Sequence, residues 1–519
     1  MKRNVIVVMF DSLGANYVGA YGNKWIKTPN MDRLAREGIL FENNYIDNLP
    51  TIPCRRSMLT GRYSVQTYGW SPLTLEETTI ADLCWGRPID TALVYDSGPL
   101  RLPKFGYSRG FDKVHFTHGN ELDTEYYHKD PLYHLDPRDY IEDHVLESAD
   151  KTLGQRIIEP LLSEITDFLR QRQHWKSDED QNVAQVMKAA VDHLKNVDRN
   201  KQFFLWIDSF DPHEPWDPPS VYDPDLTCPY DPDYKGKDMF LPLTTPVEGI
   251  YTEPELNHIR ALHAEKVTVC DKWLGYLLEN VRRLGLEEDT LFLLVSDHGE
   301  PLGHGREGHG LMRKCRPWPY EELARAPMIL RGPGLPAGKR VQGFTQSCDV
   351  GPTVTDWLGI GVHPMMTGRS LLPLAKGEVD KIREFAIAGY HKFSTAIYTE
   401  DWSYVHWRRP TDKAEGIAVR SILGGEMTKA MQSVGANTEQ GYGKAISDAA
   451  KRLQQHASLD GEDMWTCVPG SLAEVPQNDE LYDRVADPFQ LNDLAAQKPK
   501  MASELFATLR DFMAELRTT

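Results

Sequence analysis

Residues 4–10 read NVIVVMF, an unbroken apolar run rich in β-branched side chains, and Asp11 follows it directly. A run without alternating polar positions is typical of a strand that is buried on both faces of a parallel sheet. Further runs that predict strands lie at residues 39–41, 91–97, 203–207, 290–295 and 326–330. Residues 28–38, with a proline near the start and a glycine at the end, predict a helix. The sequence therefore predicts an α/β fold with a mostly parallel central sheet.

The composition narrows the class of protein and its ligands. The chain has 519 residues, of which 40% are hydrophobic, and a net charge of −18. We expect a globular chain with an ample core and no surface for nucleic acid or anionic membrane, because the summed negative charge repels phosphates. An anionic substrate must therefore be attracted by local cations or by a metal ion.

The compartment is predicted from the N-terminus and the cysteines. No segment approaches the ~18 consecutive apolar residues of a membrane span. The apolar run at residues 4–10 is too short for a signal peptide and ends at Asp11. Seven cysteines at irregular spacing, without a CxxC pair, indicate reduced thiols. We expect a cytoplasmic protein.

The sequence pattern changes near residue 375, which predicts a catalytic α/β domain at 1–375 and a small α+β subdomain at 376–519. Residues 385–407 alternate between apolar and polar side chains, as in an antiparallel sheet. A polar, weakly patterned helical insertion is expected at about 411–475, and an amphipathic helix at 500–516 closes the chain.

Three polar residues follow predicted strands. Asp11, Asp297 and His298 each lie at the carboxyl end of a strand, where open α/β sheets bind ligands, so we expect them to converge. Two carboxylates and one imidazole suit Mn²⁺ or Zn²⁺, with Ca²⁺ or Mg²⁺ as alternatives. The Thr51 hydroxyl would complete the ligand shell of one divalent ion, and coordination would lower its pKa. The alternative for Asp11 is an ordinary helix cap.

Thr51 opens the stretch TIPCRRSMLTG at residues 51–61. Thr-x-Pro is a common entry to a helix, so by itself this stretch predicts only a helix start. Together with the metal candidates, it makes Thr51 a candidate nucleophile and Arg55 a candidate to hold it in place.

With these motifs the chain resembles the sulfatase branch of the alkaline phosphatase superfamily. The matching motifs lie at residues 4–22, 28–32, 51–61, 212–215, 296–300, 309–322, 368–371 and 480–488. The resemblance implies a large α/β sandwich with a small C-terminal antiparallel domain. It also implies catalytic or anion-contacting roles for Arg55, His213, His309 and Lys314, with His309 as the acid for the leaving group.

The chain departs from the family pattern at residues that determine the reaction. Sulfatases open the signature with a cysteine or serine that becomes formylglycine, followed by x-Pro-x-Arg, whereas here the opening residue is Thr51. Cys54 is out of register, so no formylglycine is expected. Tyr95 and Ser97, candidate substrate contacts, stand where sulfatases carry Lys-x-His. This arrangement is similar to the phosphonate monoester hydrolase and phosphodiesterase branch.

We therefore expect a metal-dependent hydrolase of phosphodiesters or phosphonate monoesters that forms a covalent phosphothreonine at Thr51. A sulfatase that works without formylglycine is the nearest alternative. A phosphoryl-group transferase and an inactive sulfatase-like binding protein are the others. The expected partner is a small anionic ester; neither nucleic acid nor membrane is expected, and a homo-oligomer stays open.

Overall fold

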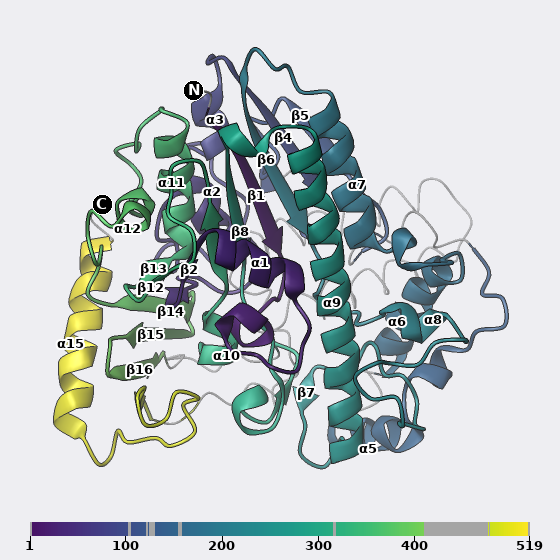
Figure 1. The fold of residues 1–519 in the computed structure, drawn as a ribbon. Coiled ribbons are helices and arrows are strands. Elements are labelled where there is room, and N and C mark those ends of the chain that lie inside the picture. The colour runs from purple at the N-terminus through teal and green to yellow at the C-terminus, as the bar shows by residue number, and fades with distance from the viewer. Residues whose placement is uncertain are drawn as a thin grey trace, which may run out of the picture.

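An eight-stranded sheet forms the centre of the molecule (Figure 1). The computed structural model describes residues 3–101, 105–120, 123, 130–153, 158–314, 318–408, 476 and 478–516. The strand order is β12-β2-β11-β8-β1-β6-β4-β5. These strands are β1 Asn4–Phe10, β2 Ile39–Phe41, β4 Ile89–Tyr95, β5 Lys113–Phe116, β6 Gln202–Ser209, β8 Thr290–Ser296, β11 Met328–Arg331 and β12 Lys339–Val341.

The sheet is mostly parallel, as predicted. β1 lies between β6 and β8 and runs parallel to both, with Phe10 opposite Ser209 on one side and Ser296 on the other. β11 is the exception, since it runs antiparallel to β8 and to β2. The carboxyl ends of β1, β6 and β8 therefore meet at one edge of the sheet.

Helices cover both faces of the sheet. Ile6 and Val8 of β1 pack in the core beneath α1, α7 and α9, whereas Val5 and Val7 pack in the core beneath α2, α3 and α11. Both faces of β1 are thus buried, which explains the unbroken apolar run at residues 4–10. Among the described residues up to 376, the α-helices are α1 Pro29–Glu37, α2 Thr51–Thr60, α3 Ile80–Cys84, α4 Gly98–Arg101, α5 Asp143–Leu153, α6 Ile158–Arg172, α7 Asn182–Lys195, α8 Pro219–Tyr222, α9 Glu253–Arg283, α10 Glu321–Ala324, α11 Val350–Trp357 and α12 Leu372–Lys376.

A second, antiparallel sheet follows in the C-terminal part. Its strands, in the order β14-β15-β16-β17, are Ala386–Tyr390, Ser394–Tyr398, Trp402–Trp407 and Glu480–Asp483. Helix α15, Pro499–Leu516, packs Leu505 and Leu509 against this sheet. The predicted small antiparallel domain is confirmed, the boundary at residue 375 stays a prediction, and the insertion at 411–475 lies outside the described residues.

Smaller elements lie outside these two sheets. Short strands pair as β7 Thr245–Pro246 with β10 Leu311–Met312, β10 with β9 Leu302–Gly303, and β3 Asn44–Tyr45 with β13 Thr345–Gln346. Single 3-10 turns lie at Ala15–Tyr17, Gly19–Tyr21, Pro137–Tyr140, Asp178–Asp180, Glu287–Asp289, Gly305–Glu307 and Ser347–Asp349. Within the described residues, no helix combines the length and apolar character that crossing a bilayer requires.

Candidate functional site

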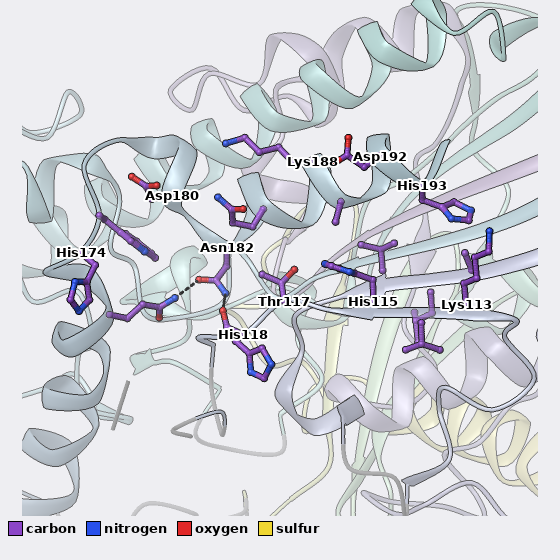
Figure 2. Close-up of a pocket in the computed structure, with 18 residues that line it drawn as sticks. Lys113, His115, Thr117, His118, His174, Asp180, Asn182, Lys188, Asp192 and His193 are labelled. Carbon is purple, nitrogen blue, oxygen red and sulfur yellow. Dashed lines mark hydrogen bonds between the residues drawn. The ribbon is translucent and has the colours of Figure 1, made fainter. Parts of the chain in front are cut away.

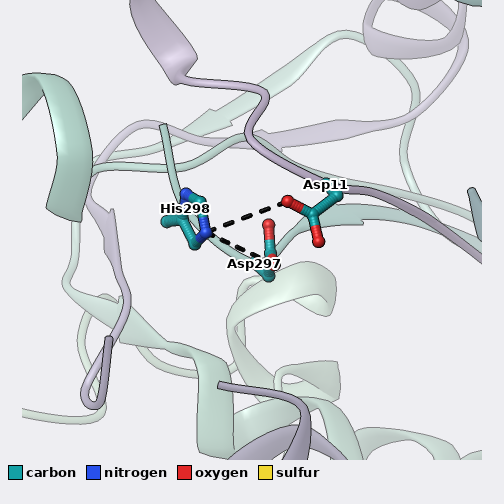
Figure 3. A group of neighbouring side chains, drawn as sticks. All are labelled: Asp11, Asp297 and His298. Atoms are coloured by element: carbon teal, nitrogen blue, oxygen red, sulfur yellow. Dashed lines mark ion pairs between the residues drawn. The ribbon is translucent and has the colours of Figure 1, made fainter. Parts of the chain in front are cut away.

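Asp11, Asp297 and His298 come together at the carboxyl edge of the central sheet (Figure 3). Because Phe10 pairs with Ser296 across β1 and β8, the residues that follow the two strands lie at the same level. One ligand atom of each side chain lies within 4.8 Å of the other two, and all three side chains are buried. His298 Nε2 lies 3.9 Å from Asp11 Oδ1 and 3.6 Å from Asp297 Oδ2. The structure thus assembles three of the four residues that the sequence proposed as metal ligands, hereafter the triad.

The protonation of the triad suits a divalent cation. His298 Nδ1 lies 2.7 Å from the carbonyl oxygen of Gly299, which only accepts, so Nδ1 carries the proton and Nε2 keeps its lone pair. Burial and the nearby Lys314 ammonium lower the pKa of His298 to about 3, so this imidazole is neutral at pH 7. Burial and the Asp297 carboxylate raise the pKa of Asp11. Asp11 Oδ2 forms an ion pair with Arg55 but accepts no hydrogen bond within the described part of the chain. Two carboxylates beside a neutral imidazole fit a divalent metal ion.

Removal of this metal is expected to abolish activity. We expect elemental analysis to find about one divalent ion per chain, and dialysis against a chelator to remove both the ion and turnover, with recovery on adding Mn²⁺ or Zn²⁺. Asp297→Asn is expected to lower metal affinity by at least ~10-fold. Asp192→Asn, at a side chain that is 69% exposed on α7, is the matched control. Full turnover by metal-free protein would contradict the assignment.

Thr51 is the first residue of α2 and lies beside the triad. Its Oγ1 is 3.4 Å from His298 Nε2, and the residue is 2% exposed. α2 ends at Thr60, and Gly61, with a φ of 66°, caps the helix in the left-handed region that glycine favours. The free backbone amides at the start of α2 favour an anion near Thr51.

Arg55 lies one turn further along α2 and is buried among three carboxylates. Its Nη1 lies 3.0 Å from Asp11 Oδ2 and 2.6 Å from Asp297 Oδ2. Its Nε and Nη2 donate to the two oxygens of Asp208 at 3.0 and 2.7 Å. Nη1 also donates to the backbone oxygen of Thr51 at 3.2 Å. Arg55 therefore links the start of α2 to the triad through the backbone of Thr51.

Lys314 forms the cationic side of the site. Its Nζ donates to Ser12 Oγ at 3.0 Å and to Glu300 Oε2 at 3.2 Å, and it lies 3.7 Å from Glu214 Oε2. His213 is the neighbour of Glu214 on the loop after β6, and its Nδ1 donates to the Glu214 carbonyl oxygen at 2.6 Å. His213 Nδ1 also lies 3.2 Å from Glu214 Oε2, so Lys314 and His213 share this carboxylate as a neighbour. Their roles as substrate contacts stay predictions.

Four charged residues of the site were not singled out from the sequence: Asp208, Glu214, Glu300 and Arg313. Asp208 follows the apolar run at 203–207 just as Asp11 follows the run at 4–10, so the same rule would have found it. Arg313 donates to Glu214 at 2.6 Å. Glu214, Glu300 and Arg313 are recognised only by their pairing across the fold.

His309 is held by contacts to Glu322, Gln490 and Tyr320. Its Nδ1 lies 2.6 Å from Glu322 Oε1, its Nε2 donates to the Gln490 carbonyl oxygen at 3.0 Å, and its ring stacks on Tyr320 with centroids 3.9 Å apart. No hydrogen bond or ion pair among the described residues joins His309 to Thr51 or to the triad. Its role as the acid stays a prediction, and it requires the ring to leave Gln490.

Tyr95 and Ser97 lie at the end of β4. The strand ends at Tyr95, so Ser97 belongs to the turn before α4 and not to the strand predicted at 91–97. Tyr95 pairs with Asp208 across β4 and β6, and its ring packs against Phe116 with centroids 5.0 Å apart. Ser97 is buried, and its hydroxyl has no hydrogen-bond partner in the part of the chain that the structure describes. Their roles in substrate binding stay predictions.

A separate cavity of about 730 Å³ lies between β5 and α7 (Figure 2). Its polar lining includes Lys113, His115, Asp180, Lys188, Asp192 and His193. The two lysines are balanced by two aspartates, so this cavity has no excess positive charge that would select an anionic ester. It also shares no described residue with the site around Thr51, and we therefore assign the chemistry to the triad.

Comparison with known proteins identifies the family of the chain. The family model described as Sulfatase matches residues 3–360. The chain is 28% identical over 420 residues to an arylsulfatase of Clostridium perfringens, with 76% of this chain and 82% of that protein covered. It is 26% identical over 435 residues to the multifunctional alkaline phosphatase superfamily protein PehA of Trinickia caryophylli, with 73% and 78% covered. A phosphonate monoester hydrolase of Agrobacterium radiobacter has the same fold, with a TM-score of 0.63 at 18% identity over 99% of this chain and 96% of that chain. The chain therefore belongs to the sulfatase family of the alkaline phosphatase superfamily and is a hydrolase that acts on ester bonds.

Proposed function

We propose that the chain is a metal-dependent hydrolase of phosphodiesters or phosphonate monoesters, with Thr51 as the nucleophile. The observation that carries the proposal is a threonine at the position where sulfatases have the residue that becomes formylglycine. Its hydroxyl lies beside the triad, 3.4 Å from His298 Nε2. Cys54 is buried in the core further along α2, and burial raises the pKa of its thiol well above the ordinary value, so it does not replace Thr51 as a thiolate.

The reaction divides into two displacements at phosphorus. Thr51 gives up its hydroxyl proton and its Oγ forms a bond to phosphorus as the bond from phosphorus to the leaving oxygen breaks. The leaving oxygen takes up one proton, so the first displacement has no net change in protons. Water then attacks phosphorus in line, the Thr51 oxygen leaves, and the hydroxyl is restored. A bound divalent cation supplies Lewis-acid stabilisation and lowers the pKa of the hydroxyl. A formylglycine hydrate expels sulfate by collapsing to an aldehyde. A threonine sulfate ester cannot react in this way, so a threonine nucleophile favours phosphorus esters over sulfate esters as substrates.

The charges around Thr51 favour a singly charged substrate. Lys314 shares its ammonium among Ser12, Glu214 and Glu300, and Arg55 is already paired with three carboxylates. Because carboxylates outnumber cationic side chains here, a second negative charge on the ester would cost more to bind. Phosphodiesters, phosphonate monoesters and sulfate monoesters each carry one charge, so this argument disfavours phosphate monoesters, and the choice of phosphorus over sulfur rests on the threonine.

A comparison of esters with the same leaving group tests this proposal. We expect kcat/KM for bis(4-nitrophenyl) phosphate or 4-nitrophenyl phenylphosphonate to exceed that for 4-nitrophenyl sulfate by at least ~10²-fold, about 2.7 kcal/mol of transition-state stabilisation. The assay uses metal-saturated protein, and a Thr51→Ala preparation purified in parallel controls for contaminating hydrolases. A preference for the sulfate ester would overturn the proposal.

A sulfatase that acts through Thr51 is the second candidate. It is favoured by the match to the Sulfatase model and by the 28% identity to an arylsulfatase. In that case the same assay gives faster turnover of 4-nitrophenyl sulfate, and Thr51→Ala still removes that turnover.

A further inference from the structure

His213 lies on a loop without regular secondary structure between β6 and α8. Its ring is buried and stacks on Phe210, with ring centroids 4.0 Å apart. Because Nδ1 donates to the Glu214 carbonyl oxygen, Nε2 is the nitrogen available to a substrate. A loop without a regular ladder of backbone hydrogen bonds depends on side-chain contacts to fix such a ring in place.

Lys266, near the middle of α9, joins the two ends of this loop. Its side chain is 1% exposed, and its Nζ lies 3.0 Å from Asp211 Oδ1 and 2.7 Å from Asp217 Oδ1. The two aspartates flank His213 in the sequence, so one ammonium holds both sides of the loop. Burial acts to lower the pKa of Lys266, but the two carboxylates raise it overall, so the ammonium stays charged at pH 7.

The same aspartates also bind two other helices. Asp211 Oδ2 accepts a hydrogen bond from the backbone nitrogen of Val183, in α7, at 3.0 Å. Asp217 pairs with Arg172, the last residue of α6. A buried network in which every charge is paired contributes more to fixing the positions of its residues than to the net free energy of folding. The loop is therefore anchored to α6, α7 and α9 around a single lysine.

We propose that Lys266 is a positioning residue for catalysis, which holds the loop so that the His213 imidazole meets the substrate anion. This inference rests on the proposed function, since His213 contacts the anion there. A lysine with a purely structural role would change stability alone. A positioning residue changes turnover only while His213 is present.

A double-mutant cycle between Lys266 and His213 tests the proposal. Lys266→Met is expected to lower kcat/KM by ~10- to 100-fold, the scale of a misplacement near 1 Å, with metal content unchanged. His213→Ala is expected to lower kcat/KM on its own, and adding Lys266→Met to it is expected to cause no further loss. Lys272→Met, on the same helix at a side chain that is 62% exposed, is the matched control and should retain wild-type kcat/KM.

Each outcome of the cycle either supports or overturns the positioning role of Lys266. Equal losses from Lys266→Met with and without His213, or no loss in the wild-type background, would overturn the positioning role and leave the proposed function standing. If His213→Ala itself has no effect, the role of His213 in the proposed function falls as well. Should Lys266→Met fail to fold, Asp211→Asn takes its place, because Lys266 then keeps Asp217 as a partner. The cycle uses whichever ester the wild type cleaves, so it does not depend on the phosphate preference.

Discussion

Thr51→Ala is expected to lower kcat by at least ~10³-fold with the fold retained, the scale of loss when a nucleophile is removed. The substitution removes the hydroxyl beside the triad, and with it the bond to phosphorus on which both displacements depend. It leaves Cβ in place in a buried helix, so circular dichroism and thermal unfolding should change little. Steady-state turnover of bis(4-nitrophenyl) phosphate at saturating metal measures the loss.

Two further variants separate the hydroxyl from the shape of the side chain. Thr51→Val keeps the shape but has no hydroxyl, and we expect it to be as inactive as Thr51→Ala. Thr51→Ser keeps the hydroxyl and loses one methyl group, so its kcat should exceed that of the alanine variant by at least ~10²-fold. Near-wild-type turnover by either variant without a hydroxyl would rule out Thr51 as the nucleophile.

Arg55→Met is expected to lower the free energy of unfolding of the metal-free protein by about 3–5 kcal/mol, the cost of leaving buried charges uncompensated. Asp11, Asp208 and Asp297 all lose a paired guanidinium in this variant. Saturating metal should reduce the loss, because the added cation compensates Asp11 and Asp297 but not Asp208. Urea unfolding with and without metal measures both effects.

Arg36→Met is the control for this substitution. Arg36 is exposed near the end of α1, so the same change there should alter stability by less than about 0.5 kcal/mol. An Arg55→Met protein as stable as the wild type without metal would show that the three carboxylates are neutral in the native state, and the charge assignment of the site would be wrong.

The sheet and the triad were predictable because both follow local rules. The run at residues 4–10 lacks polar positions because β1 is buried on both faces. This burial can therefore be predicted from the sequence of the run alone. Asp11 and Asp297 converge because parallel strands end at one edge. Thr51 was predictable as a helix start, and α2 begins there.

The remaining residues depend on pairing between distant parts of the chain. The guanidinium of Arg55 is satisfied by Asp208, which is far away in the sequence. The local pattern marks Asp208 as a carboxylate at a strand end, but it does not identify Asp208 as the partner of Arg55. His309 lies in a glycine-rich loop, and its Nε2 donates to the backbone oxygen of Gln490. Gln490 belongs to the C-terminal part of the chain. Ser97 fell outside its predicted strand because β4 ends two residues earlier, and strand ends are poorly marked where polar residues follow.

All ten residues of α2 are buried, so the helix that carries Thr51 has no face in contact with water. Local opening of such a helix would expose packed surface on every side, at a cost near that of unfolding the domain. Surface loops around the site are therefore free to change in length and composition without moving the hydroxyl. In this architecture the choice of ester can evolve in the loops, while the attacking atom stays fixed by the core.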